Sequence, residues 1–227
     1  MSGIRAAEAA AGEVEQLLDE IRADARETAV YTGRPVFAAR VLDAVRRVPR
    51  HCFVPAGLAD VAYVNDALAI GCGQTISQPY IVALMTDLAA PGEQDSVLEV
   101  GTGSGYQAAV LAQLAGRVHS LEIIETLADV ARQRLQRLGC TNVEVRCGNG
   151  CFGWPEDAPY DAILVTAAAP GVPPALLEQL KPGGRLVIPL VSRLGGQDLY
   201  LITKDKRGLI ARQNLLPVRF VPLTGLP

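Results

Sequence analysis

The sequence lacks the features that mark a nucleic-acid-binding, membrane-spanning or secreted protein. Its 227 residues carry 21 Lys and Arg against 24 Asp and Glu, so no basic excess favours a nucleic-acid partner. Its apolar runs are far shorter than the ~20 residues that cross a bilayer. Residues 1–27 form a charged helical pattern without the apolar core of a secretory signal. These absences predict a cytoplasmic protein with neither a nucleic-acid nor a membrane partner.

Cysteine and histidine are also scarce. The chain has five cysteines, and its only histidines are His51 and His119. An odd number of cysteines without a secretory signal predicts free thiols in a reducing compartment. Cys147 and Cys151 are four positions apart, which is not a usual zinc-site spacing. The sequence therefore predicts no metal site.

The most informative segment that is present is a glycine-rich loop. Residues 97–100 form an apolar run around Glu99, which predicts a buried strand. Alternating glycines follow, and they leave the backbone open to a ligand. A helical pattern at 107–114 then returns the chain across the sheet. This strand, loop and helix predict a nucleotide-type ligand at the carboxyl end of a parallel strand. The binding candidates here are Glu99, Gly101, Thr102, Gly103, Gly105 and Tyr106.

The spacing of this loop favours S-adenosylmethionine over a dinucleotide. A dinucleotide loop carries a third glycine where this chain has Tyr106. Glu122 lies 21 residues after Gly101, at the end of the next predicted strand, where an acid suits ribose hydroxyls. A third predicted strand leads to Asn149 and Gly150, where an amide could meet the adenine edge.

Each of these side chains could also have a purely structural role that involves no ligand. Glu122 could be an acid in the first turn of a helix, and Asn149 a turn former. Tyr106 could cover the cofactor or belong to the core. The ligand-binding interpretation is favoured because three successive strand ends deliver suitable groups to one edge of the sheet.

The order of elements predicts an α/β protein with a mostly parallel, doubly wound sheet. A Gly195-Gly196 turn predicts an antiparallel C-terminal edge. We expect residues 1–78 to form a helical and substrate-cleft segment packed on a Rossmann-like domain at 79–227, in a single globular unit. The predicted strands are 96–100, 117–121, 143–146, 160–166, 185–190 and 198–203, with another extended piece at 216–223. The predicted helices are 12–28, 35–47, 79–89, 105–115, 125–138 and 173–180, and a tight turn is expected at 181–184.

Four segments make the chain resemble the protein-L-isoaspartate O-methyltransferase family. They are VPRH with FVP at 48–55, GCGQTISQP at 71–79, VLEVGTGSGYQAAV at 97–110, and the stretch from 148 to LKPGGRL at 180–186. The tail PVRFVPL at 217–223 also fits. The likeness covers roughly residues 38–225. Many methyltransferases share the glycine loop. The GQTISQP segment is much more specific to this family and is therefore the main support for the resemblance.

The resemblance implies a Rossmann-like class I S-adenosylmethionine-dependent methyltransferase. It would methylate the α-carboxylate of isoaspartyl residues in aged proteins and release S-adenosyl-L-homocysteine. The ester would close to a succinimide without the enzyme, and hydrolysis would return some aspartate. The resemblance places Thr75, Ile76, Ser77 and Val221 in the substrate cleft. The chain departs from the family in carrying Asn149 where aspartate is usual, and in residues 25–35.

The scarcity of histidine suits this chemistry. A carboxylate is ionised at neutral pH and needs no base, so the protein must position it, exclude water and supply hydrogen-bond donors. We expect Ser77 to be the main catalytic contact, because it lies just before Pro79, where a helix should begin and offer free N–H groups. The alternative is that Ser77 or Gln78 only caps that helix.

Two other functions remain open at this point. One is a methyltransferase of the same fold acting on another carboxylate, such as a modified or natural-product peptide. The other is a non-catalytic binding protein that keeps the fold, for which Asn149 is the only support. In each case we expect a monomer.

Overall fold

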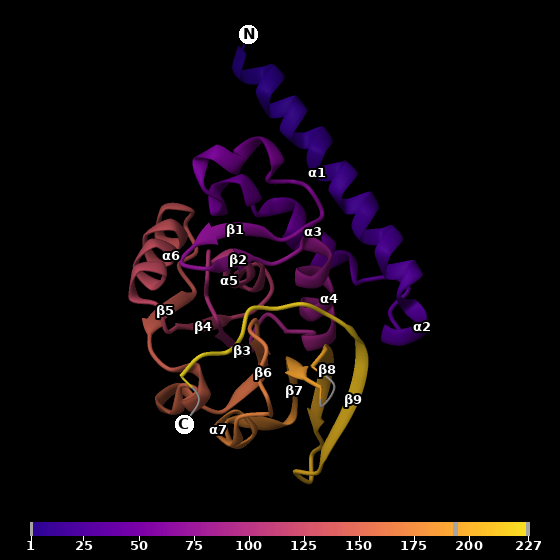
Figure 1. Cartoon of the computed structure of the whole chain (residues 1–227), viewed down its shortest axis with the longest axis vertical. Helices are drawn as coiled ribbons and strands as arrows, with labels where there is room; N and C mark the ends of the chain where they lie inside the picture. Colours follow the sequence, from indigo (N-terminus) through magenta and orange to yellow (C-terminus); the bar gives the residue numbers. More distant parts are fainter. Residues whose placement is uncertain (1, 193–194, 226–227) are drawn as a thin grey trace.

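The computed structural model describes residues 2–192 and 195–225, with side chains from residue 12 onward. Its centre is a seven-stranded sheet with the order β5-β4-β3-β6-β7-β8-β9 (Figure 1). The five strands from β5 to β7 are parallel, while β8 and β9 are antiparallel. The strands are β3 (Ser96–Val100), β4 (Arg117–Glu122), β5 (Val143–Cys147), β6 (Tyr160–Val165), β7 (Leu180–Val191), β8 (Gln197–Lys204) and β9 (Ile210–Pro217).

Alternate residues of the central strands enter two separate cores, one on each face of the sheet. Val97 and Leu164 pack with the helices of one face, whereas Leu98 and Ile163 pack on the other. The first face is covered by α4 (Pro79–Ala89), α5 (Tyr106–Ala112) and α6 (Glu125–Arg137), and the second by α7 (Pro174–Glu178) and the segment around Trp154. Burial on both faces explains why most residues of β3 and β6 are apolar.

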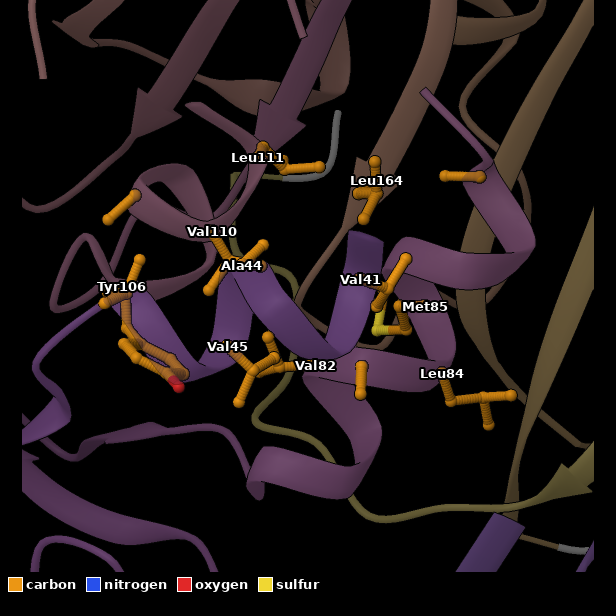
Figure 2. Close-up of a cluster of buried hydrophobic side chains, with 14 of the residues drawn as sticks. Val41, Ala44, Val45, Val82, Leu84, Met85, Tyr106, Val110, Leu111 and Leu164 are labelled. Atoms are coloured by element: carbon orange, nitrogen blue, oxygen red, sulfur yellow. The ribbon is translucent and has the colours of Figure 1, made fainter. Parts of the chain in front are cut away.

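The N-terminal elements share the core of the first face. They are α1 (Ser2–Glu27), α2 (Ala29–Thr32), α3 (Ala39–Arg47), and the 3₁₀ turns η1 (Arg50–Phe53) and η2 (Ala56–Val61). Figure 2 shows Val41 and Ala44 of α3 gathered with Val82 and Met85 of α4, with Leu164 of β6 above them in the view. The first turns of α1 extend beyond the body of the molecule (Figure 1). The division at residue 78 stays a prediction.

A small hairpin, β1 (Leu68–Gly71) with β2 (Gln74–Ile76), lies beside the N-terminus of α5 (Figure 1). It carries the GQTIS segment. Two 3₁₀ turns on the far face, η3 (Gly150–Phe152) and η4 (Pro155–Asp157), complete the elements. Among the helices in the described part of the chain, none is long and apolar enough to cross a membrane.

The sheet and its antiparallel edge confirm the predicted fold, and several boundaries were wrong. The structure has β9 at Ile210–Pro217, where the sequence predicted an extended piece only from 216. β9 is an edge strand whose first five residues are exposed, so it lacks the apolar pattern of a buried strand. The predicted turn at 181–184 lies within β7, where a register shift opposite Tyr160 and Ala162 absorbs the bend.

The helices also differ from the prediction at their ends. Helix α1 begins at Ser2 instead of residue 12, and α3 begins at Ala39 instead of 35. The Ala38 backbone N–H donates to Asp87 at 2.8 Å, and this tie to α4 fixes where α3 starts. Helix α5 stops at Ala112, three residues short of the prediction.

Candidate functional site

Two cavities open at the carboxyl ends of the central strands. The first, which we call the loop cavity, is lined by the glycine loop, the ends of β3 and β4, and tail residues 221–224. The second, the outer cavity, lies between the end of α1, residues 75–81 and the segment 216–221. Four residues line both cavities and form the junction between them: Thr75, Ser77, Thr166 and Val221.

The junction lies at the switch point of the sheet. The chain runs from β3 to β4 on one side, while β6 adjoins β3 on the other. Gly101 follows β3 and Thr166 follows β6, so both lie in the crevice between these strands. Ligands of open α/β sheets bind at this place.

Glycine is required at two positions of the loop cavity for steric reasons. Gly101 has a φ of 100°, and a Cβ built on it would collide with the Thr166 hydroxyl oxygen. A Cβ on Gly150 would collide with the Val100 side chain. The backbone of the loop therefore lies against its neighbours without intervening side chains, and both residues line the cavity.

Glu99 lies at the floor of the loop cavity and is fully buried. Its carboxyl accepts a hydrogen bond from the Ser120 hydroxyl, which lies 2.5 Å from the Thr102 hydroxyl. Burial raises the pKa of this carboxyl to about 8, although the bond from Ser120 opposes the rise. Within the described part of the chain, its second oxygen, Oε1, has no hydrogen-bond partner. Beside a cationic group of a ligand the carboxyl would ionise, and this buried oxygen would then accept a hydrogen bond from that group.

Glu122 connects the end of β4 to the glycine loop. Its carboxylate accepts from the Gly103 N–H at 2.8 Å and from the Ile124 N–H at 3.0 Å. The side chain is buried and lines the loop cavity. Each carboxylate oxygen has further lone pairs, so Glu122 can still accept hydrogen bonds from hydroxyl groups of a ligand.

Asn149 does not line the loop cavity, whereas its neighbour Gly150 does. The Asn149 Oδ1 accepts from the Cys151 N–H at 2.9 Å and so caps η3. Its Nδ2 donates to the Gly225 carbonyl oxygen at 2.5 Å. The side chain therefore contacts the C-terminal tail, and the predicted contact with adenine stays a prediction.

The tail itself forms one wall of the loop cavity. The Ala168 N–H donates to the Val221 carbonyl, and the Leu223 N–H donates to the Ala168 carbonyl, each at 2.8 Å. Sequence reasoning found Val221 in this wall and missed residues 222–224 and Thr166. The signal for Thr166 was available, because it ends the apolar strand YDAILV beside the glycine strand.

The substrate candidates lie on the hairpin side of the junction. Thr75 and Ser77 line both cavities, while Ile76 is buried and lines only the loop cavity. The capping alternative fails, because the N-cap of α4 is Gln78 and no side-chain cap bond forms there. Asn65 instead accepts from the Tyr80 N–H at 3.0 Å, and it also donates to Asp24 of α1 at 2.8 Å.

Tyr106 both lines the loop cavity and belongs to the core. Its ring meets the edge of Phe53 at 5.4 Å between centroids, and the Arg50 guanidinium lies 5.0 Å from its centre. Burial raises the pKa of its hydroxyl to about 12, so this group stays protonated. The two alternatives weighed from the sequence are therefore compatible.

The described part of the chain offers little for other kinds of catalysis at this place. Residues 2–192 and 195–225 contain no group of three His, Cys, Asp or Glu side chains arranged to hold a metal ion. His119 lies buried in the opposite core between Trp154 and Tyr160, with ring centroids 5.1 and 5.5 Å away. Because His119 lies on the other face of the sheet, the polar groups that line the loop cavity are hydroxyls, carboxyls, side-chain amides and backbone groups.

A glycine loop after the first central strand, an acid ending the next strand and a cavity at the switch point define a class I S-adenosylmethionine-dependent methyltransferase. The family model for protein-L-isoaspartate(D-aspartate) O-methyltransferase matches residues 29–226. The chain therefore belongs to the protein-L-isoaspartate O-methyltransferase family.

Individual relatives agree with this assignment. A protein-L-isoaspartate O-methyltransferase 2 from Polaromonas is 57% identical over 209 residues, which cover 92% of this chain and 99% of the relative. The protein of the same name from Syntrophobacter fumaroxidans is 55% identical over 210 residues, covering 92% and 85%. These likenesses span nearly the whole chain.

Solved structures share the fold. A protein-L-isoaspartate O-methyltransferase superposes with a TM-score of 0.80 at 29% identity, covering 93% of this chain and 66% of that one. One from Plasmodium falciparum, in complex with S-adenosyl-L-homocysteine, gives a TM-score of 0.76 at 24% identity, covering 90% and 97%.

Proposed function

We propose that this protein transfers a methyl group from S-adenosyl-L-methionine to the α-carboxylate of L-isoaspartyl residues in damaged proteins. The methyl ester then closes to a succinimide without the enzyme, and hydrolysis returns part of the material to aspartate. The observation that carries the proposal is that Thr75 and Ser77, in the GQTIS segment, line both the loop cavity and the outer cavity. A methyl donor in one cavity and a carboxylate in the other would meet at these residues.

The residues of the loop cavity fit S-adenosylmethionine. The Glu99 oxygen that has no partner in the described residues would accept from a cationic group once the carboxyl ionises, and Glu122 offers lone pairs to ribose hydroxyls. Gly101, Gly103 and Gly150 line the cavity with Thr102 and Tyr106. Gly105 does not line it and lies against Ala131 and Leu135 of α6, so its predicted contact with the cofactor stays a prediction. Bound there, the cofactor supplies a methyl group that its sulfonium already activates.

The chain's own residues then have three tasks. The Ser77 and Thr75 hydroxyls can donate hydrogen bonds to a carboxylate and fix its direction. Ile76 and Val221 exclude water from the junction. Positioning of this kind can lower a barrier by about 7–11 kcal/mol. No general base is needed, because a carboxylate is already ionised near pH 7.

Protein repair gives the direct test. An isoaspartyl peptide incubated with the protein and S-adenosylmethionine should convert over repeated cycles to a mixture enriched in the aspartyl peptide, as separated by reversed-phase chromatography. Ser77→Ala should slow this conversion. An isoaspartyl peptide that persists unchanged while the protein binds S-adenosylmethionine would contradict the proposal.

A second candidate is methyl transfer to another carboxylate. The observation that favours it is that Glu27 and Thr28, from the segment that departs from the family, line the outer cavity. Activity on a modified peptide with none on isoaspartyl peptides would support it. The third possibility, a non-catalytic binding protein, loses its argument because Asn149 does not line the loop cavity.

The remaining expectations concern the protein as a whole. We propose a cytoplasmic monomer whose partners are isoaspartyl-containing proteins or peptides, without a nucleic-acid or membrane partner. Elution from gel filtration at the mass of one chain would support the monomer, and elution at twice that mass would contradict it.

A further inference from the structure

Thr166 is the junction residue that no sequence motif identified. It follows β6 at the switch point and lines both cavities, as do Thr75 and Ser77 of the GQTIS segment. Its backbone N–H donates to the Val100 carbonyl at 2.9 Å, which holds the end of β6 against the end of β3. The side chain is therefore held in place at the boundary where a methyl group must cross.

The hydroxyl proton of Thr166 is already donated in a hydrogen bond to the backbone. It points at the Gly101 carbonyl oxygen at 2.6 Å, with the Val100 carbonyl oxygen at 3.1 Å. In the described part of the chain no group donates a hydrogen bond to this hydroxyl oxygen. Thr166 lines the junction, and because its proton is donated to these carbonyl oxygens, its hydroxyl can accept but not donate a hydrogen bond there.

An acceptor of this kind is wrong for a carboxylate and right for a positively polarised methyl group. An ionised carboxylate has no proton to give, and two oxygens with exposed lone pairs repel each other. The C–H bonds of a methyl group on a sulfonium carry positive charge, and C–H···O contacts then attract.

We propose that the Thr166 hydroxyl oxygen contacts the transferring methyl group through C–H···O hydrogen bonds. This inference rests on the proposed function for its methyl donor but not for the identity of the acceptor peptide. The contact aligns the methyl group while its bond to sulfur breaks, the electron pair stays on sulfur, and the new bond forms to the carboxylate oxygen. Because the methyl group gains positive charge on the way, the contact strengthens in the transition state.

The test compares S-adenosylmethionine with S-adenosylhomocysteine, which lacks the methyl group. Isothermal titration with the full chain, without any peptide, gives the affinity of wild type and Thr166→Val for each ligand. We expect Thr166→Val to weaken S-adenosylmethionine binding about two- to fivefold relative to S-adenosylhomocysteine. Thr166→Ser, which keeps the hydroxyl, should retain the wild-type ratio. Thr203→Val on β8, which lines neither cavity, is the matched control.

A spectroscopic measurement tests the contact independently. With ¹³C-methyl S-adenosylmethionine bound, the methyl proton resonance should lie further downfield in wild type and Thr166→Ser than in Thr166→Val. If Thr166→Val does not fold, Thr166→Ala provides the same comparison. The proposal is wrong if Thr166→Val weakens the binding of both ligands equally. That result would mean that Thr166 only holds the Gly101 backbone in place. It is also wrong if the variant raises the peptide KM alone and leaves the ligand ratio and the methyl resonance unchanged.

Discussion

The side-chain amide of Asn149 donates to the carbonyl oxygen of Gly225, 76 residues later in the chain, at 2.5 Å. This bond ties the end of β5 to the tail that walls the loop cavity. Val221 to Thr224 of that tail line the cavity, while the Asn149 side chain does not. Asparagine at this position therefore supports the cavity from outside through the tail.

Asn149→Asp separates this role from direct contact with adenine. The carboxylate keeps the cap on Cys151 but cannot donate to Gly225, so the tail should loosen. Loss of one hydrogen bond should weaken the binding of S-adenosylmethionine and of S-adenosylhomocysteine by the same factor, about two- to tenfold. Isothermal titration measures both affinities. Gln136→Glu, exposed on α6 and outside the loop cavity, controls for the added charge. Tighter binding by Asn149→Asp would instead support the adenine contact predicted from the sequence.

Glu99 should make the stability of the ligand-free protein fall as the pH rises. Its folded pKa of about 8 lies above the ordinary 4.5, so between these values the folded state holds a proton that the unfolded state has lost. Stability therefore declines across this window, by up to roughly 4 kcal/mol. Urea unfolding from pH 5 to 8.5 measures the slope. Glu99→Gln should reduce the slope of the unfolding free energy against pH, whereas Glu125→Gln, at an exposed position, should not. Parallel slopes for wild type and Glu99→Gln would show that this carboxyl is not the cause.

Ser77→Ala should impair catalysis without destabilising the fold. The Ser77 hydroxyl does not cap α4, since Asn65 accepts from the Tyr80 N–H instead. Losing a donor to a carboxylate should lower kcat/KM for an isoaspartyl peptide by roughly 10-fold or more. The free energy of unfolding, measured by thermal denaturation, should stay within about 0.5 kcal/mol of wild type. Thr203→Ala on β8, which lines neither cavity, is the control and should keep most of its activity. Full activity in Ser77→Ala would remove Ser77 from the site.

The charges around the outer cavity should select among substrates. Asp24, Glu27 and Asp66 line it, with Arg219 as its one basic residue in the described part of the chain. An isoaspartyl peptide with a neighbouring lysine should show a lower KM than one with glutamate, by about threefold at low salt, and less at high salt. Glu27→Gln should reduce the difference in KM between the lysine and glutamate peptides. Glu20→Gln, on the same helix outside this cavity, should not. Equal KM values would refute this electrostatic preference.

The parallel sheet and the glycine loop could be predicted from the sequence because their signals are local. Strands such as β3 and β6 are buried on both faces and so are mostly apolar, with Glu99 and Asp161 among the exceptions. The edge strand β9 escaped this reasoning because a strand with one exposed edge needs no such pattern.

The arrangement of the site depended on contacts between distant residues. Thr166 reaches Gly101 across 65 positions, and Asn149 reaches Gly225 across 76. The cap on α4 comes from Asn65, 15 residues from its partner Tyr80, instead of from the adjacent Ser77 or Gln78. No local pattern specifies such pairs, so sequence reasoning named the strand ends and the GQTIS segment but not the partners that hold them.

The most direct test of the account is transfer of labelled methyl from S-adenosylmethionine to two peptides that differ only in having aspartate or isoaspartate at one position. The account predicts base-labile label on the isoaspartyl peptide and none above background on the aspartyl peptide. Label on both, or on neither while cofactor binding is intact, would contradict it.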